Sequence, residues 1–203
     1  NTTNPDVLDL MSVSQDLGIR SIVARNHNVS TNTLEFLSHD KTAKIRHCVM
    51  CNPKVTPTIL TRHVKDRSVD VRMSIAKSNV VPVSVLEMLA KDKKSKVQTM
   101  VAANKRTPAH VLTMLANVEK QDLSVLNAIA ENSNTPPETL TMMIEQRPEF
   151  SRVDNWFLRY AVARNPNTSR ETLEKLEHDP LENVSKYATA NLMVRHGKGQ
   201  KNG

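Results

Sequence analysis

The feature that most constrains the fold of this chain is an internal repeat that runs through most of its 203 residues. A hinge, usually an asparagine, recurs at intervals of 26, 26, 26, 28, 33 and 26 residues. The hinge positions are Asn26, Asn52, Ser78, Asn104, Asn132, Asn165 and Asn191. A regular period of this length is typical of a solenoid, in which one structural unit stacks on copies of itself.

Apolar residues recur at helical spacing on both sides of each hinge. Seven residues before the hinge lies an aliphatic residue: Ile19, Ile45, Val71, Val97, Val125, Leu158 or Val184. Mostly apolar residues follow three and four positions later, as Ile22 and Val23 do, which is one face of a helix. Eight residues after the hinge lies a leucine: Leu34, Leu60, Leu86, Leu112, Leu140 or Leu173. The pattern predicts two short helices per unit, and stacked units that share one core.

The hinge itself predicts a tight turn between the two helices. Asparagine tolerates a left-handed backbone conformation, so we expect it to close the first helix in that conformation. Threonine or serine then caps the second helix, and Pro57, Pro108 and Pro136 suit its first turn, where a missing N–H costs nothing.

The repeated motif resembles the leucine-rich repeat variant, a helical relative of HEAT repeats. The segments Val97–Ala116 and Ala161–Thr168 carry this resemblance most clearly. It implies an all-α fold, a right-handed α-solenoid of about seven helix-turn-helix repeats, in which α-helices alternate with shorter, partly 3₁₀, helices. Some members of that family hold an iron–sulfur cluster in a cysteine-rich segment ahead of the repeats. The printed sequence has no such segment, so we expect no cofactor.

The domain organisation follows from the same register. We expect one helical-repeat domain over residues 1–193, with half-repeat caps at 1–18 and 184–193, and a disordered basic tail at 194–203. No stretch is long and apolar enough to predict a membrane span, and no secretory leader is visible. We therefore expect a cytoplasmic protein. The oligomeric state does not follow from the sequence.

The charge pattern favours an acidic partner. The chain has a formal charge of +7, which is favourable for binding nucleic acid or an acidic protein. Equivalent loops of a solenoid stack along one edge, so basic residues in them form a candidate nucleic-acid ridge, with two more at the opposite turns. Its residues are Lys41, Lys44, Arg67, Lys93, Lys94, Lys96, Lys105 and Arg106. The alternative interpretation is a set of solvated loops with no ligand.

Aspartate and arginine also recur in step. Asp40 precedes Arg46 by six residues, and Asp66 precedes Arg72 by the same number. We expect these residues to form a structural ladder between neighbouring repeats. A row of arginines that binds phosphate is the alternative.

Cys48 and Cys51 form a C-x-x-C pair with His47 and His63 nearby. A structural zinc site needs four ligands, and Cys48 falls on a predicted core position. We therefore expect neither a metal site nor a redox role, and His63, which replaces a core leucine, should be partly buried.

The candidate protein-binding face combines two features. An insertion over residues 147–157 holds the only tryptophan, and insertions in repeat proteins often lie on the binding face. In addition, the position five residues before each hinge is expected to point furthest from the core. The candidate residues are His47, Met73, Tyr160, Phe150 and Trp156. Alternatively, Phe150 and Trp156 fill a gap between mismatched repeats.

No catalytic motif is present: the sequence has no H-E-x-x-H, no phosphate-binding glycine loop and no G-x-S-x-G. We predict a non-catalytic scaffold that mediates macromolecular interaction, with a protein as its partner. The alternative is an RNA- or DNA-binding protein that uses the basic ridge.

Overall fold

The computed structural model describes residues 4–145 and 156–199, and it places α-helices and no strands in these ranges. The chain divides into two units, residues 1–106 and 107–203. Unit 1 holds α1 (Pro5–Ser12), α2 (Leu17–Arg25), α3 (Thr31–Ser38), α4 (Ala43–Met50), α5 (Pro57–Arg62), α6 (Val69–Lys77), α7 (Val83–Leu89) and α8 (Ser95–Ala103). Unit 2 holds α9 (Ala109–Ala116), α10 (Leu123–Glu131), α11 (Pro137–Glu145), α12 (Trp156–Arg164), α13 (Arg170–Leu176) and α14 (Glu182–Gly199).

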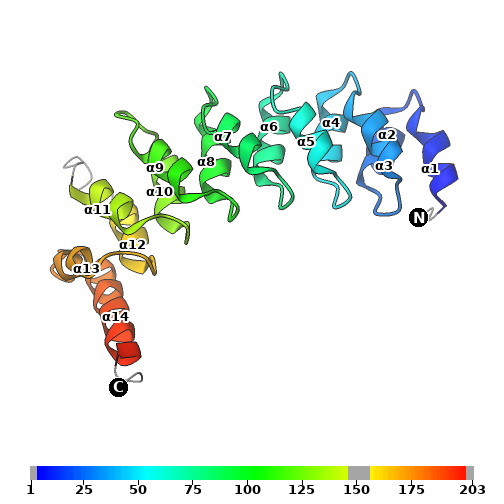
Figure 1. Ribbon diagram of the computed structural model, residues 1–203. Helices are drawn as coiled ribbons and strands as arrows, with labels where there is room; N and C mark the ends of the chain where they lie inside the picture. The colour runs from blue at the N-terminus through cyan, green and yellow to red at the C-terminus, as the bar shows by residue number, and fades with distance from the viewer. Residues whose placement is uncertain (1–3, 146–155, 200–203) are drawn as a thin grey trace. The chain divides into compact units, whose positions relative to one another are not determined.

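The predicted all-helical repeat is confirmed in both units. In unit 1 the first helices of successive repeats, α2, α4, α6 and α8, pack side by side (Figure 1), and in unit 2 α10, α12 and α14 do the same. The leucine column eight residues after each hinge, from Leu34 to Leu173, is fully buried throughout. Of the aliphatic column before the hinge, all members from Ile45 to Val184 are fully buried. Ile22, which the apolar pattern placed on the buried face of its helix, is instead 61% exposed.

The hinge asparagines do not adopt the left-handed conformation that the sequence suggested. Asn26 and Asn104 have extended backbones, with φ of −71° and −74°, and no described residue has a positive φ. The preference for asparagine at the hinge is explained instead by its amide side chain, which both donates and accepts hydrogen bonds. Its oxygen accepts from the backbone N–H two residues on, for example from Lys54 to Asn52 at 2.9 Å.

The nitrogen of the same amide joins each repeat to the one before it. Asn52 Nδ2 donates to the carbonyl oxygens of Ala24 and Asn26, at 2.8 and 3.1 Å. Asn104, Asn165 and Asn191 make the equivalent pair of bonds one repeat back. Carbonyls at a helix C-terminus have no hydrogen-bond partner within the helix. The amide supplies that partner, so these buried carbonyl groups are not left unsatisfied.

The hinge at Ser78 lacks this amide. Its hydroxyl accepts a hydrogen bond from the Val80 N–H at 3.3 Å. A hollow of about 450 Å³ lies beside it, lined in part by Met50, Asn52 and Ser78. This junction therefore differs from its neighbours in hydrogen bonding.

We predict that Asn52→Ala lowers the free energy of unfolding by about 2 kcal/mol, because it removes two inter-repeat hydrogen bonds at roughly 1 kcal/mol each. Ser78→Ala is the matched control at a hinge without an amide, and it should cost less than about 1 kcal/mol. Urea unfolding followed by circular dichroism measures both. Equal losses in the two variants would contradict the proposed role of the amide.

Aspartate and arginine form the predicted structural ladder. Arg46 Nε donates to Asp66 Oδ2 at 2.7 Å, and its terminal nitrogen donates to the backbone carbonyl of Asp40 at 2.8 Å. Arg20, Arg46 and Arg72 thus each bind the carboxylate 20 residues ahead and the backbone carbonyl six residues behind. The other pairs are Arg20–Asp40, Arg72–Asp92 and Arg159–Asp179. These guanidinium groups are buried and occupied, so they are not a phosphate-binding row.

The pKa of the ladder carboxyls follows from this geometry. Burial on its own raises the pKa of Asp40, Asp66 and Asp92, but hydrogen bonds from an arginine and from a backbone N–H outweigh it. Each pKa therefore lies below its ordinary value. A lowered folded-state pKa stabilises the fold above the unfolded-state pKa, and this contribution disappears as the pH falls through the folded-state value.

We expect unit 1 to lose stability as the pH falls below about 4, the ordinary aspartate pKa. Asp66→Asn should cost about 3 kcal/mol at neutral pH, because it leaves the buried Arg46 guanidinium without its anion. It should also flatten the acid limb of a stability–pH curve measured by urea titration. Asp70→Asn removes an exposed carboxylate as the control, and an identical acid limb in both variants would refute the assignment.

The C-terminal region differs from the expected tail. Helix α14 continues to Gly199, so residues 194–199 are helical where the sequence suggested disorder, and residues 200–203 lie outside the described part. No proline interrupts the backbone hydrogen bonds over this stretch. That the two units form one domain over residues 1–193 stays a prediction. Among the described residues, no helix has the length and apolar character needed to cross a membrane.

Candidate functional site

Unit 2 carries a cluster of aromatic side chains on the first helices of two successive repeats, α12 and α14. Trp156 and Tyr160 stand one helical turn apart, and their ring centroids are 5.7 Å apart. Tyr160 meets Tyr187 of the next repeat edge to face at 5.0 Å. Phe157 contacts both Trp156 and Tyr160. These four residues are four of the six aromatic residues in the chain, so the aromatic content is concentrated here.

Arg164 completes the cluster. Its guanidinium carbon lies 5.2 Å from the centroid of the Tyr160 ring and 5.4 Å from that of Tyr187, within range of cation–π attraction. It also donates to the Tyr160 hydroxyl at 3.3 Å. We call Trp156, Phe157, Tyr160, Arg164 and Tyr187 the aromatic surface. Its members are held by one another, yet Trp156 and Tyr187 remain 41% and 43% exposed.

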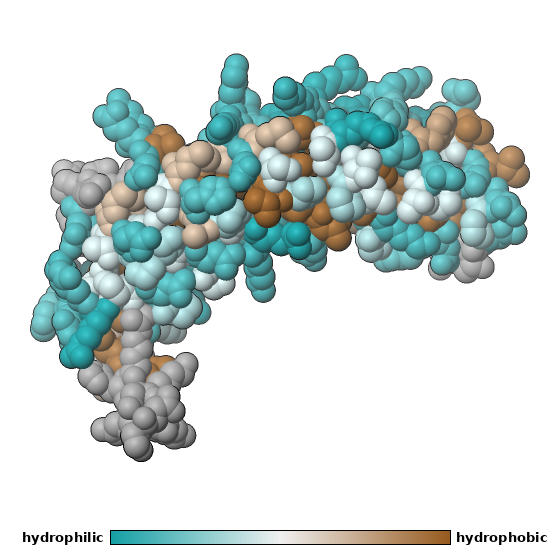
Figure 2. All heavy atoms as spheres, in the orientation of Figure 1, coloured by the Kyte–Doolittle hydropathy of each residue, from teal (hydrophilic) through white to brown (hydrophobic). Residues whose placement is uncertain are grey.

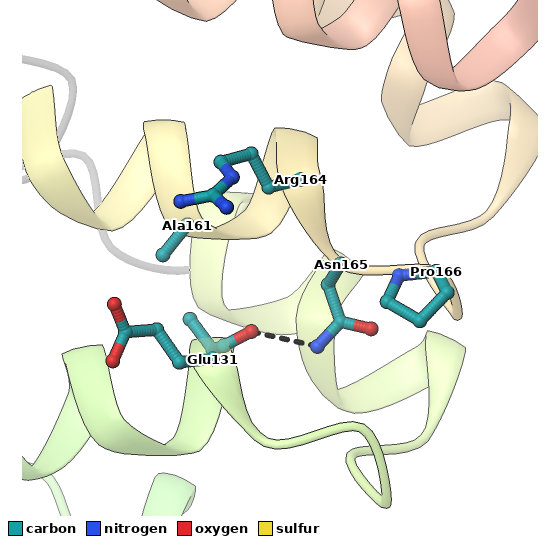
Figure 3. A pocket seen from close by; sticks show the side chains of 6 residues that line it. Glu131, Ala161, Arg164, Asn165 and Pro166 are labelled. Atoms are coloured by element: carbon teal, nitrogen blue, oxygen red, sulfur yellow. Dashed lines mark hydrogen bonds between the residues drawn. The ribbon is translucent and has the colours of Figure 1, made fainter.

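A hollow of about 240 Å³ adjoins this surface (Figure 3). Glu131 from α10 and Arg164 from α12 line it, together with Ala161 and Pro166. The dashed line in the figure is the 2.6 Å hydrogen bond from Asn165 to the Ala130 carbonyl. The hollow therefore presents both signs of charge next to exposed aromatic rings.

The structure brings together only part of the predicted protein-binding face. Tyr160 and Trp156 belong to the aromatic surface, whereas Phe150 lies outside the described residues. His47 and Met73 lie in unit 1 and are half-buried. Phe157, Arg164 and Tyr187 were not among the residues predicted for that face. The recurrence of tyrosine at Tyr160 and Tyr187, about one repeat apart, is the sequence signal that points to them.

The sequence suggested that the position five residues before each hinge points furthest from the core. In the structure it does not. Ser21 occupies it in the first repeat and is only 8% exposed. Neighbouring first helices pack against this side, and His47 Nδ1 lies 2.8 Å from the Ser74 hydroxyl of the next repeat. At the ends of α2 and α12, in contrast, Arg25 and Arg164 are exposed.

The predicted basic ridge divides into two groups at opposite ends of the helices. Lys105 and Arg106 follow α8, whereas Lys93 and Lys94 precede it. A helix of nine residues separates the groups by about 13 Å. The larger group lies in the loops before α4, α6 and α8 and in the first turns of α4 and α8, and these loops run along the upper edge of unit 1 in Figure 1.

Lys65 and Lys91 also belong to that larger group. We call it the basic edge. Its members are Lys41, Lys44, Lys65, Arg67, Lys91, Lys93, Lys94 and Lys96, and all of them are exposed. Figure 2 shows hydrophilic side chains projecting along this margin.

The two cysteines have different surroundings. Cys48 is buried and accepts a hydrogen bond from Arg25 Nε at 3.2 Å, whereas Cys51 is exposed, with its sulfur 3.9 Å from His47 Nε2. Within the described residues, no group of three or more histidine, cysteine or acidic side chains is arranged to hold a metal ion. His63 is half-buried, as expected, and bonds the Ser38 hydroxyl at 2.9 Å.

We expect iodoacetamide to alkylate Cys51 in the native protein and Cys48 at least about 100-fold more slowly, since Cys48 reacts only after local opening. Mass spectrometry of the native protein over time measures both rates. In urea the two thiols should react alike, which is the internal control. Rapid alkylation of Cys48 in the native state would contradict its burial.

Comparisons with known proteins agree with the resemblance and the fold. Residues 156–181 match the family model described as leucine rich repeat variant. The fold is similar to a solved structure described as a leucine-rich repeat variant with a novel repetitive structural motif. That match has a TM-score of 0.59 and 21% identity, and it covers 93% of this chain and 82% of the other. At this identity the likeness establishes the fold alone.

Two other solved structures are similar at lower scores. One is an engineered protein, with a TM-score of 0.44 and 14% identity over 93% of this chain and 67% of the other. The second is a designed armadillo repeat protein, with a TM-score of 0.36 and 14% identity over 94% of this chain and 99% of the other. A search of the curated proteins found no match.

Proposed function

We propose that this chain is a non-catalytic repeat scaffold that binds a partner protein through the aromatic surface of unit 2. The observation that carries the proposal is the exposure of Trp156 and Tyr187, each about two-fifths exposed beside the half-buried Phe157 and Tyr160. A helical-repeat fold supports a binding or structural role in general. The aromatic surface is the feature that favours a protein as the partner.

The composition of the surface supports this choice. Tryptophan, tyrosine and arginine are the residues most enriched among those that dominate the energy of protein interfaces. Here they are held in place by one another, so little side-chain entropy remains to be lost on binding. The hollow beside them supplies Glu131 and Arg164 for polar contacts at the margin.

The charge of unit 2 also argues for a protein over a nucleic acid at this surface. Residues 107–203 contain 11 lysine and arginine residues and 12 acidic residues, a formal charge of −1. A polyanion would gain nothing from the long-range field of such a unit. Nucleic-acid binding, the alternative drawn from the sequence, concerns a different surface in unit 1.

We predict that Trp156→Ala/Tyr187→Ala abolishes capture of the partner, because alanine at such a position costs about 2 kcal/mol or more, roughly 30-fold in affinity. The experiment is a pull-down from native lysate with the tagged chain, with and without nuclease, quantified by mass spectrometry. Proteins that the unmodified chain retains in the presence of nuclease should be lost from the double variant.

Phe36→Ala is the matched control, since Phe36 is 56% exposed on α3 of unit 1 and lies outside the aromatic surface. Circular dichroism confirms that each variant is folded. Retention that is unchanged in the double variant, or that nuclease eliminates, would rule out the proposed interface.

A further inference from the structure

The excess positive charge of the protein resides entirely in unit 1. Residues 1–106 contain 17 lysine and arginine residues against 9 acidic ones, a formal charge of +8, whereas unit 2 has a charge of −1. A strong charge asymmetry between the parts of a chain indicates an interaction with a polyanion.

The inter-repeat loops align the cations in register. Lys41, Arg67 and Lys93 each follow a ladder aspartate directly and are spaced 26 residues apart. Adjacent loops are in contact, since the Arg67 guanidinium donates to the Lys41 backbone carbonyl at 3.2 Å. Lys65 and Lys91 repeat the same spacing two residues earlier. The basic edge is therefore a row of cations that repeats once per structural unit.

The ladder removes the negative charge from this row. Asp40, Asp66 and Asp92 lie in the same loops, but arginines from the preceding first helices hold their carboxylates, whose side chains are only 5–8% exposed. No described carboxylate forms an ion pair within 4 Å of any member of the basic edge. The loops thus expose their lysine and arginine side chains and conceal their aspartates.

A shallow hollow lies between the first two of these loops. Lys41, Arg67, His39 and His63 line it together with the ladder residues, and its volume is about 360 Å³. Lysine and arginine side chains are general phosphate ligands. The hollow has the chemistry for one phosphate group, and the cations continue along the edge on either side of it.

We propose that the basic edge of unit 1 binds the phosphate backbone of nucleic acid without reading its sequence. A row of regularly repeated cations matches a linear polymer of regularly spaced anions. The loops that carry the row contain no phenylalanine, tyrosine or tryptophan, and their aromatic rings are the imidazoles of His39 and His63. They therefore lack the row of large rings on which successive unpaired bases stack. Binding is therefore to phosphates, and a duplex, with its denser charge, is bound at least as tightly as a single strand.

The test is fluorescence anisotropy with a labelled DNA duplex of about 30 base pairs and the matching single strand, in about 50 and about 200 mM NaCl. We expect a micromolar Kd for the duplex and a steep loss of affinity with salt. The edge variant Lys41→Glu/Arg67→Glu/Lys93→Glu should weaken duplex binding at least tenfold. It should also reduce the slope of log affinity against log salt by roughly 0.9 for each lost phosphate contact.

The control variant is Lys54→Glu/Lys77→Glu/Lys105→Glu, which changes the net charge of unit 1 by the same amount at the opposite, turn end of the repeats. Equal losses in the two variants would overturn the assignment to the edge. Failure to bind duplex in low salt, or binding only to vesicles of anionic lipid, would overturn the proposal for nucleic acid. The variants leave unit 2 unchanged, so the result is independent of the proposed protein interface.

Discussion

The hydrogen bonds from the hinge asparagine to two carbonyls of the preceding repeat are the interaction on which the rest of the structure depends. Apart from α14, the helices have six to nine residues, and isolated helices of that length are unstable in water. Short helices also have a large share of unpaired terminal carbonyls. The asparagine amide satisfies those carbonyls while it holds the next repeat in register, so that the buried leucine columns meet.

The arginine–aspartate ladder does the equivalent work at the other end of the helices. It links α2, α4 and α6 each to the loop behind it and the loop ahead of it, as Arg46 does between Asp40 and Asp66. These paired and buried charges hold the loops in place. Because they are neutralised, the exposed lysines determine the electrostatic potential at the surface of the loops. One structural device thus determines which charges a ligand meets.

The positions that depart from the repeat are the ones that suggest function. Core, hinge and ladder positions are constrained by stacking, so their residues report on the fold. Trp156 and Tyr187 keep about two-fifths of their surface exposed, and the lysines of the loops are exposed, so stacking alone does not account for them. The two surfaces differ in chemistry, one aromatic in a nearly neutral unit and one basic in a strongly positive unit. This difference is the physical basis for expecting two kinds of partner.

The sequence by itself determined the period, the two helices per unit and the identity of the core, because the 3.6-residue periodicity of apolar residues is local and repeats seven times. Even the ladder was visible as Asp40 and Arg46 recurring in step with Asp66 and Arg72. Only the tertiary structure decided what each position faces. Contacts between repeats determine which carbonyls Asn52 donates to, why Ser21 is buried and why Tyr160 meets Tyr187. Those contacts follow from how one helix packs on the next, and spacing along a single helix does not specify them.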